Sequence, residues 1–133
     1  IKVYAIETNP DAVNLTKQNC KKQNLANVKV IENLAPSGFD NLPVPTNVFR
    51  GGSKGNLREI LQSLADKKSG MRIVINAVSL ETIAEVSNIA DDFNISDFEA
   101  VCINVGKAKK IGGYHLMQAN NPVYIFSFDL QAE

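Results

Sequence analysis

Apolar runs of strand length alternate along this chain with amphipathic stretches of helical length. The apolar runs include segments 2–6 and 72–77, and the amphipathic stretches include segments 9–24 and 57–64. This alternation is typical of βαβ units around a largely parallel sheet. A chain of 133 residues with 44% hydrophobic content suffices for one core, so we expect a single domain over residues 1–133.

Two helix starts are marked by local signals. Asn9 is a good N-cap, and Pro10 suits the first helical position, so a helix is expected from there to about residue 24. Asn56 and Glu59 have the spacing of a capping box at the start of a second helix. One stripe of that helix is expected to be buried, and it consists of Leu57, Ile60, Leu61 and Leu64.

The last three strands predict how the sheet is completed. The continuous apolar run 72–77 is typical of a strand covered on both faces by helices. Segments 98–105 and 122–128 lack an intervening helix, so we expect an antiparallel pair joined by a loop around 107–114.

Charge and composition exclude several classes of protein. Fourteen Lys and Arg balance fourteen Asp and Glu, which disfavours nucleic acid and acidic membranes as partners. Apolar runs fall short of the ~20 residues that span a bilayer, and no signal peptide is evident, so a cytoplasmic protein without membrane contact is expected. Cys20 and Cys102 lack metal-ligand spacing, so we expect reduced thiols and no metal. The chain opens directly in a strand without Met, which suggests that the natural polypeptide begins upstream.

Five segments carry a family resemblance: 3–10, 34–36, 49–55, 72–82 and 121–124. In their order and spacing they resemble the decarboxylating precorrin methyltransferases, which are class I enzymes that use S-adenosylmethionine. The resemblance implies a Rossmann-like fold with sheet order 3-2-1-4-5-7-6, mostly parallel strands and a terminal antiparallel pair. Segment 2–6 is then strand two, and the family's strand one and its glycine loop have no counterpart. Arg50 and Lys54 also depart from the family pattern, which has a small or apolar residue and a glycine there.

The resemblance implies that S-adenosylmethionine is the cofactor. A carboxylate at the end of strand two can accept hydrogen bonds from both ribose hydroxyls, and Glu7 has that place. Its competing interpretation is a solvated acid at a strand end. Gly51 permits positive φ and a close approach of a ligand. The full set of expected cofactor-binding residues is Glu7, Thr8, Leu34, Ala35, Gly51 and Gly52, with the turn at Leu34 against the adenine.

The implied reaction is methylation of carbon 15 and decarboxylation of a precorrin or cobalt-precorrin in cobalamin biosynthesis, by a homotetramer. The carboxylates of this substrate would be bound by Arg50, Lys54, Lys107 and Lys110. Tyr114 and His115, the sole histidine, are candidates for proton transfer, although a lone histidine beside glycines is more often structural.

Two other functions compete with this one. A tRNA adenine methyltransferase has the same architecture and would need a local basic surface. A non-catalytic fragment or assembly module is the alternative from a different class. Since a central strand has no counterpart, we expect little or no methyltransferase activity from this chain alone.

Overall fold

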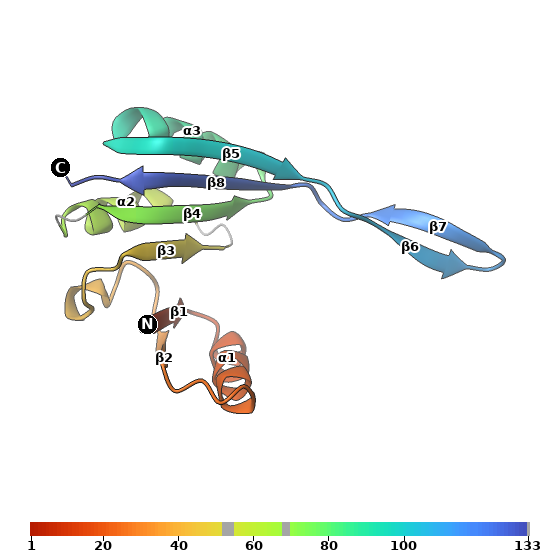
Figure 1. The fold of residues 1–133 in the computed structure, drawn as a ribbon, viewed down its shortest axis with the longest axis horizontal. Coiled ribbons are helices and arrows are strands. Elements are labelled where there is room, and N and C mark those ends of the chain that lie inside the picture. Colours follow the sequence, from red (N-terminus) through yellow and green to blue (C-terminus); the bar gives the residue numbers. More distant parts are fainter. Residues whose placement is uncertain (52–54, 68–69, 133) are drawn as a thin grey trace. The chain divides into compact units, whose positions relative to one another are not determined.

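The computed structural model describes residues 1–51, 55–67 and 70–132. The chain divides into two compact units, Ile1–Pro43 and Val44–Glu133, and each is described by itself. Strands and helices alternate up to residue 103, as the apolar pattern predicts, and the remaining elements are strands (Figure 1). The single-domain organisation stays a prediction.

The first unit is a βαβ unit followed by a short turn. It contains β1 (Val3–Glu7), α1 (Pro10–Lys22), β2 (Val28–Glu32) and the 3-10 helix η1 (Phe39–Asn41). β1 and β2 are parallel, with Val3 opposite Val28 and Glu7 opposite Glu32. The two strands therefore end side by side, and polar residues that follow them share one edge.

The start of α1 is the predicted one. The side-chain oxygen of Asn9 accepts hydrogen bonds from the backbone amides of Asp11 (2.9 Å) and Ala12 (3.4 Å). These bonds satisfy amides that have no partner within the helix, which is why Asn is favoured there. The helix ends at Lys22, shortly before Asn24, which has a left-handed φ of 56°.

The second unit contains a four-stranded sheet in the order β3-β4-β8-β5. Its elements are β3 (Asn47–Arg50), α2 (Leu57–Ala65), β4 (Met71–Ala77), α3 (Leu80–Asp92), β5 (Ile95–Ile103) and β8 (Val123–Leu130). β3 and β4 are parallel, and β8 is antiparallel to both β4 and β5. This confirms the expected strand order four-five-seven-six with a reversed strand seven.

The core of the second unit lies between one face of this sheet and the helices α2 and α3, which both lie on that face (Figure 1). Burial alternates along β4, from Met71, buried, to Arg72, half-buried, and so on to Ala77. The expectation that helices cover both faces of this strand is therefore wrong for the part of the unit that the structure describes. The buried residues include Leu57, Ile60, Leu61, Leu64, Ile73, Ile75, Val86, Ile89, Phe128 and Leu130.

The segment between β5 and β8 is an extended hairpin rather than the expected loop. β6 (Gly106–Ile111) and β7 (Tyr114–Ala119) pair in antiparallel register and form an arm beyond the end of β5 (Figure 1). Gly112 has a φ of 60°, and a two-residue Gly-Gly connection is a favoured hairpin turn because it tolerates positive φ. Every residue of β6 and β7 is exposed.

Arg72 connects three strands on the face of the sheet that α2 and α3 do not cover. Its guanidinium donates to Asp129 Oδ1 (3.2 Å) and Ser127 Oγ (3.0 Å) on β8, and to the carbonyl oxygen of Asp97 (3.4 Å) on β5. Asp97 lies at a β-bulge with a φ of 50°, which breaks the regular ladder. The guanidinium thus supplies hydrogen bonds at the place where the ladder is interrupted.

Replacing Arg72 with methionine is expected to lower the free energy of unfolding by about 1–2 kcal/mol, because Asp129 and Ser127 lose a half-buried charged donor. Urea unfolding followed by circular dichroism measures it. Arg58→Met is the control, because the ion pair of Arg58 with Asp92 has side chains 51% and 54% exposed and is expected to contribute less than about 1 kcal/mol. Equal losses in both variants would contradict a special role for Arg72.

Within the described ranges, none of the helices has the length and apolar character that a bilayer crossing requires.

Candidate functional site

Glu7 is the last residue of β1, and its carboxylate has a fixed orientation. Oε1 accepts hydrogen bonds from the backbone amides of Thr8 (2.8 Å) and Asn9 (2.9 Å). These amides belong to the connection that leads into α1, whose N-cap is Asn9. The same short segment therefore positions the carboxylate and starts the helix, so a change at Glu7 also affects the start of α1.

The turn at Leu34 lies at the same edge as Glu7. The backbone amide of Asn33 donates to the carbonyl oxygen of Glu7 (3.1 Å), and this bond extends the ladder between the two strands. Asn33 Oδ1 accepts from the amide of Leu34 (2.8 Å), whose side chain is 51% exposed. The structure thus brings Glu7, Leu34 and Ala35 together at the carboxyl ends of β1 and β2. Sequence reasoning missed Asn33, although Asn at the start of a turn is a known signal.

Gly38 supports this turn from behind. It has a φ of +89°, which disfavours any residue with a side chain. A Cβ atom at this position would lie 3.2 Å from Asn33 Nδ2. The absence of a side chain at Gly38 therefore leaves room for the amide that holds the Leu34 turn.

Arg50 ends β3 in the second unit, and its guanidinium is directed to the start of α2. Nη2 donates to Asn56 Oδ1 (3.0 Å). Burial lowers the pKa of Arg50, and the nearby carboxylate of Glu85 on α3 opposes that shift. The predicted capping box is wrong, because the side chain of Asn56 makes no capping hydrogen bond and accepts from Arg50 instead.

The glycine-rich segment that follows is described only at its ends. Gly52 and Lys54 lie outside the described residues. Gly51 does not have the positive φ that its sequence position allows, whereas Gly55 does, at +68°. A Cβ atom on Gly51 would lie 3.4 Å from Cε1 of Phe49, an ordinary contact distance.

The other predicted residues lie on the arm. Lys110 is opposite His115, so these two share one face of the hairpin. Lys107, opposite Gln118, and Tyr114, opposite Ile111, project from the other face because successive strand residues alternate. The two lysines therefore do not converge on one ligand-sized surface within a single arm.

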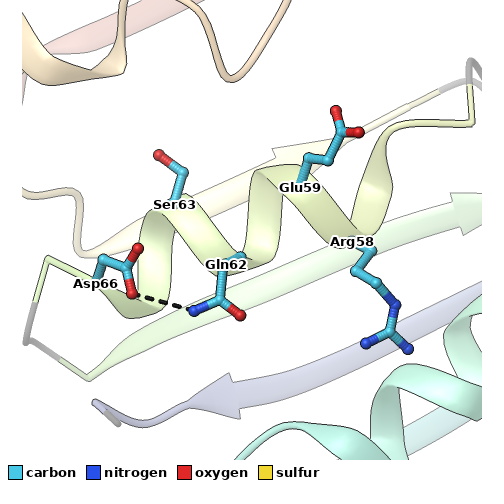
Figure 2. Close-up of a pocket in the computed structure, with 5 residues that line it drawn as sticks. All are labelled: Arg58, Glu59, Gln62, Ser63 and Asp66. Atoms are coloured by element: carbon cyan, nitrogen blue, oxygen red, sulfur yellow. Dashed lines mark hydrogen bonds between the residues drawn. The ribbon is translucent and has the colours of Figure 1, made fainter.

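A hollow of about 500 Å³ lies along the outer side of α2, where the side chains of Arg58, Glu59, Gln62, Ser63 and Asp66 project (Figure 2). Gln62 Nε2 donates to Asp66 Oδ1 (3.1 Å), and Arg58 forms an ion pair with Asp92. All of these lining residues lie on α2 or at its C-cap. Binding sites instead have polar groups that converge from several elements, so this hollow does not resemble one.

Metal-ligating side chains are scattered. Over residues 1–51, 55–67 and 70–132, no three His, Cys, Asp or Glu side chains are grouped so as to hold an ion. Cys20 and Cys102 are free thiols.

The sequence profile of the precorrin methyltransferase domain matches residues 1–130. A protein of Sulfurisphaera tokodaii, named as a probable cobalt-precorrin-6B C15-methyltransferase (decarboxylating), is 36% identical over 126 residues, which cover 93% of this chain and 65% of that protein. The chain thus spans about 65% of the length of this relative.

Two solved structures are similar in sequence and in fold. Precorrin-6y C5,15-methyltransferase from Geobacter metallireducens superposes with a TM-score of 0.84 at 38% identity, covering 96% of this chain and 65% of that one. Precorrin 8W decarboxylase from Methanobacterium thermoautotrophicum gives 0.81 at 32% identity, covering 95% and 68%. Other solved methyltransferases share the fold at lower identity. The chain therefore has a class I methyltransferase fold and belongs to the precorrin methyltransferase domain family.

Proposed function

We propose that the polypeptide containing this chain methylates carbon 15 of a precorrin and removes a carboxyl group from it, in cobalamin biosynthesis, with S-adenosylmethionine as the methyl donor. Family membership supports the reaction class. The single structural observation that carries the cofactor assignment is the oriented carboxylate of Glu7 beside the Leu34 turn, at the carboxyl ends of two parallel strands. Ligands of open α/β sheets bind at such ends.

The described residues fit the nucleoside part of this cofactor. The Glu7 carboxylate accepts hydrogen bonds and is held by two backbone amides, which suits recognition of the ribose hydroxyls, with Thr8 beside it. Leu34 offers an exposed apolar side chain to the flat face of adenine, and Ala35 continues that turn. A cofactor contact by Gly51 and Gly52 stays a prediction from the family resemblance. When bound, the cofactor supplies an electrophilic methyl group, so no enzyme nucleophile is needed.

The protein's own contribution is positioning. Methyl transfer requires an in-line approach of the acceptor carbon, and holding that geometry supplies much of the rate. Arg50, Lys54, Lys107 and Lys110 are proposed to bind substrate carboxylates, and exclusion of water would favour loss of carbon dioxide. Tyr114 and His115 are proposed as candidates for proton transfer.

Replacing Glu7 with glutamine is expected to weaken binding of S-adenosylhomocysteine by at least about tenfold, because one charged acceptor of the ribose hydroxyls is lost. Calorimetry on the full-length protein measures it. Glutamine keeps a carbonyl oxygen for the amides of Thr8 and Asn9, so the start of α1 is preserved better than by alanine.

Glu32→Gln is the matched control, because Glu32 lies opposite Glu7 in the strand register but has no proposed role. It is expected to leave the affinity within about twofold. No binding by the unaltered protein, or equal weakening by both variants, would reject the cofactor assignment.

We also propose that the protein assembles as a homotetramer and that the arm formed by β6 and β7 is a contact between copies. An isolated two-stranded hairpin is marginally stable in water, and every residue of this one is exposed. Large apolar side chains project from both of its faces: Met117 from one, and Ile111 and Leu116 from the other. A second copy of the arm would cover them.

Replacing Leu116 with aspartate is expected to reduce the molecular mass in solution to that of a smaller assembly, because a charge would be buried at the contact. Light scattering after size-exclusion chromatography measures the mass. Leu15→Asp, which changes a leucine of α1 that is 57% exposed, is the control and is expected to leave the mass unchanged. An unchanged mass for Leu116→Asp would contradict the arm contact.

A further inference from the structure

Two large aliphatic side chains are exposed at the connection between β4 and α3. Val78 is 63% exposed and Leu80 is 79% exposed. They flank Ser79, the N-cap of α3. Single exposed apolar residues are common on protein surfaces, so exposure alone indicates no site. Two further observations indicate a site: the connection that carries this pair is held by hydrogen bonds, and the pair lies at an end of the sheet where ligands bind.

The connection is held rigidly. Ser79 Oγ accepts a hydrogen bond from the amide of Thr82 (3.2 Å) and lies 3.0 Å from Thr82 Oγ1. Thr82 is 1% exposed, so this bond is anchored in the core. In a hydrophobic staple, Val78 would pack against Ile83 and be covered. Its 63% exposure shows that most of its side chain is presented to solvent instead.

The pair lies at the carboxyl end of β4, the end of the sheet where open α/β folds bind their ligands. Arg50, opposite Ile75 in the register, ends β3 at that same end. β8 begins there, with Tyr124 opposite Ala77 and 36% exposed. An apolar pair, an aromatic hydroxyl and a guanidinium therefore border one end of the sheet.

We propose that Val78 and Leu80 contact the apolar face of the tetrapyrrole ring of the substrate and contribute to its specificity. The inference rests on the proposed function and deepens it. Such a substrate combines a flat apolar ring with carboxylates around its edge. Burying the ring against two aliphatic side chains is favourable, and charge complementarity directs the carboxylates toward Arg50.

One acidic residue of α3 sets the orientation. Glu81 follows Leu80 directly and is exposed, so it disfavours a carboxylate arm beside the start of α3. Glu85 lies one turn later and near Arg50, so it weakens the attraction of that guanidinium for a carboxylate. A protein partner is the competing occupant, but two side chains are far fewer than the roughly 20–30 residues that each side of a stable interface contributes.

The test is the double variant Val78→Ser/Leu80→Ser in the full-length protein. Neither change removes Ser79 or Thr82, so the start of α3 is retained. Uroporphyrin III, a tetrapyrrole with carboxylate arms, is the probe, and its fluorescence reports binding. The dissociation constant is expected to rise about tenfold or more, because the ring loses apolar contact. The affinity for S-adenosylhomocysteine and the molecular mass are expected to stay unchanged.

Leu15→Ser is the matched control, since Leu15 is 57% exposed on α1 and is expected to leave uroporphyrin binding unchanged. An unchanged affinity in the double variant, equal weakening in the control, or a fall in molecular mass would overturn the inference, the last by making the pair a contact between proteins. Failure of the proposed function looks different: the unaltered protein would then bind no tetrapyrrole at all, and the inference would fall with it.

Discussion

Replacing Phe128 with alanine is expected to lower the free energy of unfolding by about 3–5 kcal/mol. Phe128 is 0% exposed on β8, opposite Ile73 of β4, and its ring centroid lies 6.2 Å from that of Phe98. Truncation removes the apolar contacts of the ring and leaves a cavity. Because β8 is paired with a strand on each side, it cannot shift to close that cavity. Urea unfolding followed by circular dichroism measures the loss.

Phe49→Ala is the matched control for this experiment. Phe49 is 66% exposed on β3, so its truncation removes little buried area and is expected to cost less than about 1 kcal/mol. A loss of similar size in both variants would mean that the helix-covered face of the sheet is not the main core of the second unit.

The second large effect is expected at Gly38. Replacing it with alanine should lower the free energy of unfolding by about 2–3 kcal/mol, because a side chain is strained at a φ of +89° and its Cβ would lie 3.2 Å from Asn33 Nδ2. The displaced Asn33 side chain would also release the amide of Leu34. Weaker binding of S-adenosylhomocysteine should therefore accompany the loss of stability.

Gly112→Ala separates the two causes. Gly112 has a φ of +60°, but no atom lies within 4 Å of a Cβ built there. Its replacement introduces backbone strain alone, so the free energy of unfolding is expected to fall by about 1 kcal/mol and cofactor binding to stay unchanged. If both variants lose the same stability and neither changes cofactor affinity, the contact with Asn33 has no role in supporting the Leu34 turn.

Much of the fold is predictable from the sequence because its signals are local. The N-cap at Asn9 and the buried stripe of α2 follow from spacing alone, and both are present. The burial of β4 is not predictable in this way. Half-buried Arg72, Val74 and Asn76 alternate with the buried residues of β4. Because Val74 is apolar, the sequence looks like a continuous apolar run, although helices cover only one face in the described part of the unit.

The hairpin arm was predictable from Gly112 and Gly113, which form a two-residue turn signal. The prediction failed because the flanking segment 107–110 is rich in lysine and shows no apolar alternation. Strand pairing here is set by the turn and by exposed backbone, neither of which a hydrophobic pattern detects.

The candidate site was predictable in its first half only. Glu7 and Leu34 follow from the rule that parallel strands end together, whereas Asn33 acts through a side-chain bond that the strand pattern does not contain. At Asn56, a guanidinium from β3 replaced the backbone amides as the partner, and such competition between distant residues is invisible in a local motif. The cytoplasmic location and the tRNA-modifying alternative stay predictions.

The position of β8 has a consequence for how the protein is made. β8 lies between β4 and β5, yet it follows both along the chain. The ribosome therefore delivers two apolar strands that have no common neighbour until residues 123–130 emerge from the exit tunnel. We expect chaperones to bind β4 and β5 while their edges are unpaired. A stop codon before residue 123 is expected to yield a product that aggregates, because both strands then lack β8 as a partner.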